Sequence, residues 1–201
     1  MTIHEEQKFK TNEAIINSLV ILAETKPLSK ISVSDITKFG NINRGTFYLH
    51  YESKEDLIEN LEAKLLKEIT EIVNQNIEIT MDISYFLAGK PYPVIGLLID
   101  FVFENQKIFK ILLNSNTSIL FRDSVKIILQ DIIIKSLKTS KKDSKYFHGI
   151  PDSYALEIIS SSILAIIMKW IEDTDEMTPE KVSKLIMSSL FLSPYEMLDL
   201  A

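Results

Sequence analysis

Apolar residues recur at three- and four-residue intervals along most of this chain, which is the spacing of helices that bury one face. Over residues 5–25 the stripe consists of Ile15, Leu19 and Leu22. Pro27 ends this segment, because the residue before a proline is driven out of the helical region. The chain is therefore predicted to begin with an amphipathic helix.

A much longer helix is predicted over about residues 53–80. Ser53 and Asp56 form a capping box at its start, in which the hydroxyl accepts from a free backbone N–H and the carboxylate reaches back. Apolar residues then return near every fourth position. A helix of roughly 25 residues extends about 38 Å. It would begin beside the preceding segment and end deep in the second half, so it is a candidate lever between the two.

The second half of the chain repeats the helical pattern after an interruption at residues 89–93. Pro93 suits the first turn of a new helix. The helical segments predicted from there cover residues 94–103, 108–113, 118–137, 151–171 and a last helix that begins at Thr178-Pro179-Glu180. A polar loop is predicted at residues 139–145, and no strand-like alternation longer than four residues competes with the helices. The predicted fold class is therefore all-α.

Residues 31–57 place three helix starts close together. Ser32 with Asp35 forms a capping box that opens a short helix. Gly40-Asn41 ends this helix, since both residues tolerate the left-handed conformation of a tight turn. Asn43 is a good N-cap for a second short helix. Two short helices around a tight turn form a helix-turn-helix, whose second helix can enter a DNA major groove.

The second short helix carries groups suited to DNA. Arg44 can grip the O6 and N7 atoms of guanine with two N–H groups, and Asn43 can do the same for adenine. Gly45 has no side chain, so the helix can approach DNA closely, while Phe47 is expected to point inward. Hydroxyl, phenol, imidazole and ammonium groups can anchor phosphates. The predicted DNA-contacting residues are Ser34, Asn43, Arg44, Gly45, Thr46, Tyr48, Leu49, His50 and Lys54.

These residues resemble the DNA-binding signature of the TetR (tetracycline-repressor-like) transcriptional regulators. The close resemblance covers residues 31–61, a looser one reaches back to about residue 10, and beyond residue 65 only the helical layout agrees. The family usually has Ala-Gly where this chain has Gly40-Asn41. The resemblance implies an N-terminal three-helix DNA-binding domain in a homodimer that binds a palindromic operator and releases it when an effector binds. Repression is the expected output, although the family includes activators.

The last two helices carry more apolar surface than one soluble chain is expected to bury, which favours a symmetric partner. The segment at residues 151–171 is apolar nearly all round. In the resembled family the corresponding pair of helices forms a four-helix bundle across a two-fold axis. The dimer-interface residues predicted on this basis are Leu156, Ile159, Ile163, Ile167, Leu185 and Ser189.

A pocket for an effector is expected between the helices of the second half. Its candidate residues are aromatic and methionine side chains at helix edges, although side chains of these types also serve as plain core. They are Tyr85, Phe86, Tyr92, Phe103, Phe109, Met168 and Trp170. The nearest charged residues, Asp100 and Lys169, do not lie clearly inside an apolar stretch. An apolar or amphipathic effector is therefore expected.

The net charge of −6 is unusual for a DNA-binding protein, but its distribution is uneven. Residues 1–55 contain seven basic and seven acidic residues, so the excess of acidic residues lies entirely in the remainder. The first part can therefore present a basic face. We predict a DNA-binding domain over residues 1–52 and an effector-binding and dimerisation domain over residues 53–201.

The composition also narrows the cellular setting. The chain has no cysteine, which excludes disulfides, thiolate nucleophiles and cysteine-based zinc sites and suits a reducing compartment. Its first residues are polar, and its longest charge-free runs have eleven residues, too few to span a bilayer. We therefore expect a cytoplasmic protein with no membrane partner.

The sequence gives no sign of an enzyme site. His4, His50 and His148 are scattered, and neither a Gly-rich phosphate loop nor a zinc-protease motif occurs. The acidic cluster at residues 172–176 suits a solvated turn better than a metal site. We predict no enzymatic activity, no cofactor and no metal. The alternative function is a module that binds a hydrophobic ligand or a partner protein, with vestigial DNA binding.

Overall fold

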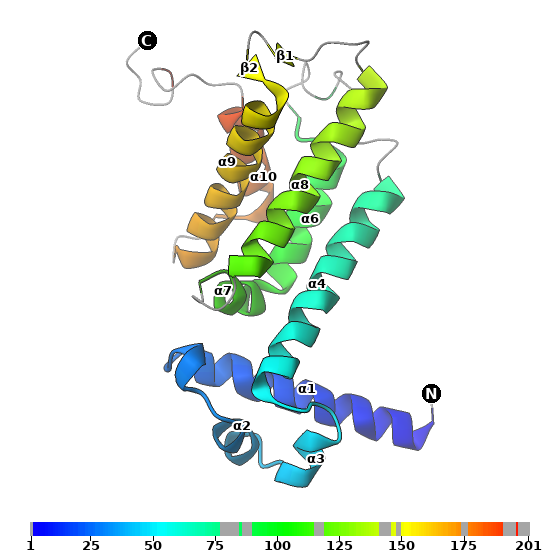
Figure 1. The fold of residues 1–201 in the computed structure, drawn as a ribbon, viewed down its shortest axis with the longest axis vertical. Coiled ribbons are helices and arrows are strands. Elements are labelled where there is room, and N and C mark those ends of the chain that lie inside the picture. Colours follow the sequence, from blue (N-terminus) through cyan, green and yellow to red (C-terminus); the bar gives the residue numbers. More distant parts are fainter. Residues whose placement is uncertain are drawn as a thin grey trace. The chain divides into compact units, whose positions relative to one another are not determined.

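The computed structural model describes residues 2–76, 85, 90–114, 119–140, 146–147, 150–173, 177–190 and 196. Within these residues the chain is almost entirely helical (Figure 1), which confirms the all-α fold class. The helices are α1 (Ile3–Ala23), the 3-10 helix η1 (Leu28–Lys30), α2 (Val33–Phe39), α3 (Arg44–Tyr48), α4 (Lys54–Asn76), α6 (Pro93–Glu104), α7 (Gln106–Asn114), α8 (Ile119–Ser140), α9 (Asp152–Glu172) and α10 (Pro179–Ser189). A short antiparallel hairpin pairs β1 (Tyr146–Phe147) with β2 (Ile150–Pro151).

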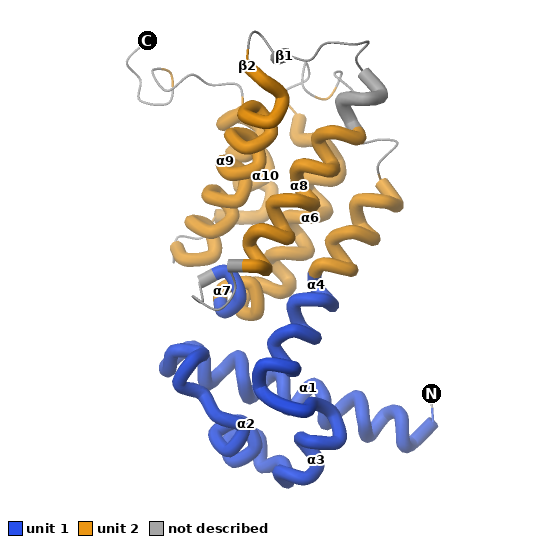
Figure 2. The backbone as a smooth tube through the Cα atoms, viewed as in Figure 1, with its two compact units in different colours: residues 1–65, 111–119 blue, residues 66–110, 120–201 orange. Residues whose placement is uncertain are grey.

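The chain divides into two compact units (Figure 2). Unit 1 contains Met1–Leu65 and Ile111–Ile119, and unit 2 contains Leu66–Lys110 and Leu120–Ala201. The division falls within α4, which continues as one helix through it. The domain boundary that we predict at residue 53 lies at the start of that helix and stays a prediction. The predicted end of the helix, residues 77–80, lies outside the described residues.

The core of unit 1 follows the apolar stripe of the sequence. In this unit α1 contacts α2, and α2 contacts α3. Burying one large apolar side chain contributes roughly 1.5–3 kcal/mol, so a few such residues hold the short helices in place. Those with exposed fractions of 2% or less are Ile15, Leu19, Ile31, Ile36, Phe47, Leu57, Leu65, Leu112 and Leu113.

Unit 2 has its own buried centre. Val73 of α4, Val94 of α6 and Ile132 of α8 form one cluster of buried residues. On another side α6 contacts α10, and α10 contacts α9. The helix starts are those predicted, because Pro93 occupies the first turn of α6, and the Thr178 side chain accepts from the backbone N–H of Lys181 to cap α10.

One helix end differs from the sequence prediction. α8 continues to Ser140, so the first residues assigned to the polar loop, Thr139 and Ser140, are helical. Polar residues alone do not stop a helix when no Gly or Pro is present. An ion pair at helical spacing, Lys135 with Asp131 at 2.8 Å, supports the preceding turn. His148 lies outside the described residues.

α9 is the one helix among the described residues that is long and apolar enough to cross a membrane, by length and composition alone. The prediction from charge-free runs did not anticipate this, because a few charged residues near the helix ends are compatible with a span. A single such helix is weak evidence, since core helices pass the same test. Several α9 side chains, including Leu164 and Trp170, are buried in unit 2.

Candidate nucleic-acid interface

Gly40 and Asn41, the two residues of the turn between α2 and α3, have different structural roles. Asn41 has a φ of 49°, the only positive φ of a non-glycine residue within the described part of the chain, whereas Gly40 has a φ of −79°. A Cβ atom on Gly40 would lie against Ser18 Oγ of α1 and 2.9 Å from Cδ1 of Ile42. Gly40 therefore lets α2 approach α1, and Asn41 supplies the left-handed conformation. Both residues tolerate that conformation, but only Asn41 adopts it.

The predicted capping box at the start of α2 is present. The Ser32 hydroxyl accepts from the Asp35 backbone N–H at 3.2 Å, and Asp35 Oδ2 accepts from the Ser32 backbone N–H at 2.8 Å. Lys26 Nζ also donates to this carboxylate oxygen at 2.8 Å. The Lys26 ammonium, together with the hydrogen bonds from Ser32, holds the pKa of Asp35 well below its usual range. Lys26 is thus already paired, and Asp35 fixes the start of α2.

The next helix, α3, is capped and anchored as predicted. Asn43 Oδ1 accepts from the backbone N–H of Gly45 at 2.8 Å. Phe47 points inward and is fully buried. A two-pronged contact to adenine requires the same Asn43 oxygen. In the free protein this oxygen is therefore already engaged as the cap of α3.

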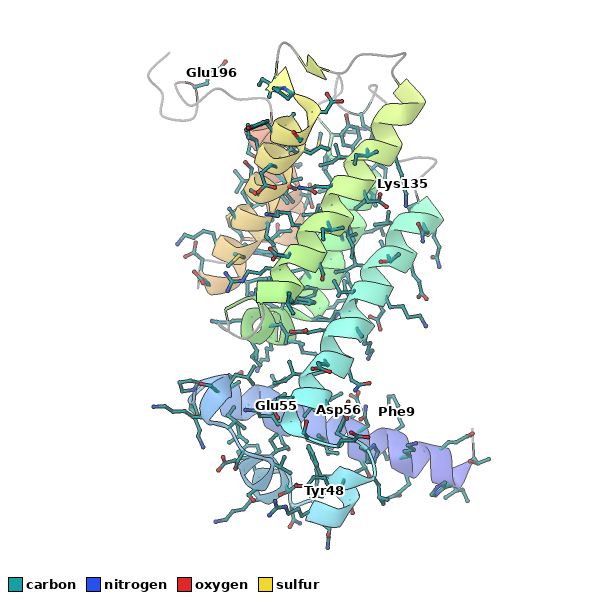
Figure 3. The ribbon with its side chains drawn as sticks, in the orientation of Figure 1. Phe9, Tyr48, Glu55, Asp56, Lys135 and Glu196 are labelled. Carbon is teal, nitrogen blue, oxygen red and sulfur yellow. The ribbon has the colours of Figure 1, made fainter. Side chains whose placement is uncertain are left out.

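The opposite face of α3 is exposed to solvent. Arg44, Gly45 and Tyr48 are exposed, and Leu49, which follows the helix, has an exposed fraction of 80%. Tyr48 is labelled on α3 in Figure 3. Arg44 Nη2 donates to the Tyr48 hydroxyl oxygen at 3.2 Å, and the guanidinium carbon lies 5.7 Å from the centre of the Tyr48 ring. Four of the nine residues predicted to contact DNA are therefore exposed together on and just after α3.

Two other predicted contacts lie nearby in unit 1. Ser34 of α2 is exposed, and Thr46 of α3 is half-buried. The sequence prediction omitted two cations of the same unit, Lys30 and Lys38, which are exposed and make no ion pair within the described residues. Residues 26–50 contain four basic residues and one acidic residue, a net charge of +3. This local excess of basic residues is not apparent in the count over residues 1–55. A net positive charge favours phosphate binding.

Lys54 is the first residue of α4, at the helix start where it was predicted, but its ammonium group is already engaged within the protein. Its Nζ donates to the backbone oxygen of Leu28 at 3.1 Å and lies 3.4 Å from Glu55 Oε1. The side chain has an exposed fraction of only 12%. The backbone oxygen belongs to the short helix η1 and also accepts from the Ile31 backbone N–H at 3.2 Å. Lys54 therefore ties η1 to the start of α4, where Figure 3 labels Glu55.

His50, two residues after α3, is half-buried. Burial, together with the nearby Lys8 ammonium, lowers the pKa of His50. The next residue, Tyr51, donates its hydroxyl to Asn12 Oδ1 of α1 at 2.5 Å. Burial raises the pKa of Tyr51. The segment that follows α3 is thus fixed to α1 by a part-buried hydrogen bond, with His50 and Lys8 beside it.

Among the described residues, the side chains predicted for the effector pocket lie in several different environments. A cavity of about 270 Å³ lies between α9 and α10, and of the seven predicted residues it contains only Trp170. Trp170 Nε1 donates to the backbone oxygen of Met177 at 2.9 Å. The cavity is lined by Ala165, Ile166, Lys169, Trp170, Asp173, Met177, Val182 and Leu185.

The other predicted pocket residues have separate environments. Phe109 belongs to the core, with its ring centre 5.9 Å from Phe101 and 6.2 Å from Phe121. Phe103 stacks on Trp170 with ring centres 6.0 Å apart. The half-buried residues are Tyr85, Tyr92 and Met168, and Phe86 lies outside the described residues. Aromatic type alone could not separate core from cavity, because both environments select the same side chains.

The residues predicted for the dimer interface divide between core and surface. Ile163 and Ile167 are buried within unit 2, and Leu185 is exposed. The half-buried residues of the set are Leu156, Ile159 and Ser189. The large apolar side chains exposed on α9 are instead Tyr154 (67%) and Ile158 (58%). A helix that is apolar all round does not reveal in its sequence which face packs inside its own unit.

Comparison with known proteins identifies a family for this chain. A TetR-family model, described as the C-terminal region of transcriptional regulators, matches residues 89–191, just over half of the chain. A curated relative, the uncharacterized HTH-type transcriptional regulator YxbF of Bacillus subtilis (strain 168), is 39% identical over 61 residues. That match covers 30% of this chain and 16% of the relative, so the chain spans a small part of that protein's length.

Two solved structures share the fold over nearly the whole chain. A putative TetR-family regulator from Syntrophomonas wolfei str. Goettingen has a TM-score of 0.65 and 21% identity, covering 92% of this chain and 94% of its own. A TetR regulator from Streptococcus agalactiae 2603V has a TM-score of 0.61 and 23% identity, covering 94% and 97%. These likenesses establish the fold, and the family model covers the half that the DNA-binding motif does not reach. The chain therefore belongs to the TetR family of transcriptional regulators.

Proposed function

We propose that this chain represses transcription by binding a palindromic operator as a homodimer, and releases it when a small apolar or amphipathic effector binds. The observation that carries the proposal is the exposed face of α3, on which Arg44 and Tyr48 lie one helical turn apart beside Leu49. The buried Phe47 anchors the other side of the same helix and keeps this face outward. The protein would act in the cytoplasm.

Each exposed group on this surface has a chemical counterpart on DNA. Arg44 has the donors for a two-pronged contact to guanine, and Leu49 offers an apolar contact for a thymine methyl group. Lys30 and Lys38 have ammonium groups that can neutralise phosphates, which fix the position of the helix in the groove. Base contacts supply the specificity in this arrangement, and the lysines supply affinity that depends on salt.

Selection of bound sites from random duplex DNA tests this function. We expect a palindrome whose half-sites are centred about 34–36 Å apart, one turn of DNA. Lys38→Ala should weaken binding to all sequences and reduce the salt slope by about 1. Lys110→Ala removes an exposed lysine of α7 and is the matched control, with unchanged binding expected. Salt-sensitive binding with no selected sequence would contradict the proposal.

The dimer is proposed to form through the exposed apolar face of α9 and α10. Tyr154 and Ile158 of α9 and Leu185 of α10 supply large exposed side chains. Ile158→Glu should yield monomers in sedimentation, because a buried unpaired carboxylate is strongly unfavourable. The matched control is Ile127→Glu, at an exposed isoleucine of α8. An unchanged dimer in Ile158→Glu would reject this face as the interface.

The cavity between α9 and α10 favours a second candidate function, a module that binds a hydrophobic ligand or a partner protein. Its lining is mostly apolar, and Trp170, the only tryptophan of the chain, forms part of its wall. Trp170 fluorescence therefore reports ligand entry. A ligand that changes this fluorescence and lowers operator affinity supports the regulator, since coupling requires different affinity for the two states. Ligand binding without sequence-specific DNA binding would favour the second function.

The direction of regulation needs a separate test, because activators also occur in the family. A reporter gene placed behind the selected operator should fall in expression when the protein is present. A rise in expression would identify an activator that uses the same DNA-binding surface.

A further inference from the structure

Arg44 does not extend freely into solvent. Its guanidinium folds back over one turn of α3, where Nη2 donates to the Tyr48 hydroxyl oxygen at 3.2 Å. The same group lies over the face of the Tyr48 ring, with Cζ 5.7 Å from the ring centre. Tyr48 therefore holds Arg44 in two ways, through its hydroxyl and through its ring.

The Tyr48 ring is itself supported by the core. Its centre lies 5.6 Å from that of the Phe47 ring, and the two planes meet at 89°, a T-shaped contact. Phe47 has an exposed fraction of 0%. A fixed core ring thus supports an exposed ring, which in turn supports the cation. This chain of contacts limits the orientations that are open to Arg44.

The contact leaves most of the Arg44 donors available. A guanidinium has five N–H groups, and the bond to Tyr48 uses one of them. A two-pronged contact to guanine needs two more. Holding a long side chain in place before binding reduces the conformational entropy lost when the complex forms. A fixed guanidinium plane also favours the one base edge that matches its orientation.

We propose that Tyr48 is a positioning residue that orients Arg44, so that base discrimination by Arg44 depends on the Tyr48 hydroxyl. This inference rests on the proposed function of α3 as the DNA-reading helix. It differs from the sequence-based prediction for Tyr48, in which the phenol anchors a phosphate. A phosphate anchor changes affinity for all sequences equally, whereas a positioning residue changes the preference for one base.

Tyr48→Phe is the critical variant, because it keeps the ring and removes only the hydroxyl. Each protein is offered the selected operator in competition with operators altered at one base, the base whose preference Arg44→Ala relaxes. The ratio of the two affinities is the base discrimination of that protein. We expect Arg44→Ala to reduce this discrimination roughly five- to 150-fold. Tyr48→Phe should reduce it roughly two- to tenfold, and Tyr48→Leu, which also removes the ring, should reduce it further. Lys38→Ala is the reference for uniform loss across sequences.

The double variant separates positioning from an independent contact. If Tyr48 acts through Arg44, Tyr48→Phe has no further effect on discrimination in the Arg44→Ala background. Equal weakening of matched and altered operators by Tyr48→Phe, or additive losses in the double variant, would overturn the inference while leaving α3 as the reading helix. Unchanged base preference in Arg44→Ala itself would overturn the proposed function of α3 and the inference with it.

Discussion

Replacement of Gly40 by alanine tests how closely α1 and α2 approach each other. An added Cβ would lie against Ser18 Oγ and 2.9 Å from the flexible end of Ile42. Ser18 is buried, and its hydroxyl donates to the backbone oxygen of Ala14 at 2.6 Å. The methyl group can be accommodated only if Ser18 turns away or the two helices separate.

The expected loss of stability follows from two opposing effects. Adding a methyl group to a well-packed contact costs about 1–3 kcal/mol. The backbone of Gly40 (φ −79°, ψ 1°) is accessible to alanine, and such replacements stabilise by about 0.4–1 kcal/mol through the unfolded chain. Gly40→Ala should therefore lower the free energy of unfolding by about 0.5–2 kcal/mol.

A second substitution identifies the cause of that loss. Ser18→Ala removes the oxygen that the new methyl group would strike. Alone it should be neutral or slightly stabilising, because the Ser18 hydroxyl bonds a carbonyl of its own helix, and alanine is the better helix former. In the Gly40→Ala background it should restore most of the lost stability. The two changes should thus be non-additive, as expected for residues in contact.

Urea unfolding followed by circular dichroism measures these free energies. Gly96→Ala is the matched control, since no atom lies within 4 Å of a Cβ built at Gly96 of α6. It should stabilise the chain by about 0.5–1 kcal/mol. If Gly40→Ala is as stable as the wild type, or if Ser18→Ala restores nothing, then the close approach of α1 and α2 does not explain the glycine.

Three further predictions concern the same unit. Asn41→Gly should raise the free energy of unfolding by up to about 1 kcal/mol, because glycine adopts the positive φ freely; lower stability would mean that the Asn41 side chain contributes to the turn. Tyr51→Phe, which removes the hydrogen bond to Asn12, should lower the free energy of unfolding by about 0.5–1.5 kcal/mol. An unchanged free energy of unfolding would show that this bond is not stabilising. The pKa of His50 in the folded chain lies below 6.5, so the unfolded chain takes up this proton first, and stability falls as the pH drops through 6.5. Lys8→Ala should raise this pKa in an NMR titration, and a constant value would exclude Lys8 as a cause.

Features that depend on residues close in sequence were predictable. The capping box needs only Ser32 and Asp35, three positions apart, and the cap of α3 needs only Asn43 and the next backbone N–H groups. The inward orientation of Phe47 follows from the helical period. These local signals were sufficient for the helix-turn-helix and for the residues exposed on α3.

Features that depend on contacts between distant residues were not predictable. The bond between Lys54 and the Leu28 backbone spans 26 positions, and the sequence predicted a phosphate contact for Lys54 instead. The reason for Gly40 lies in α1, at Ser18. The exposed side of α9, marked by Tyr154, could not be read from a helix that is apolar all round.

Membership of the TetR family provides information that the short-range sequence patterns do not. TetR-family members are non-enzymatic DNA-binding regulators, which confirms the prediction that this chain is not an enzyme. The cavity beside Trp170 and the exposed face of α9 belong to the half of the chain that the family model covers. The effector and the dimer, which would use these two features, are proposals that the experiments above test.

The most direct test of the central claim, that α3 reads DNA sequence through Arg44, is a parallel site selection with the wild-type chain and the Arg44→Ala variant. Both proteins should select the same palindrome, and the variant should lose its preference at one base in each half-site. Circular dichroism of the variant should be unchanged, because Arg44 is exposed. Identical base preferences from both proteins, or no selected sequence from the wild type, would contradict the account.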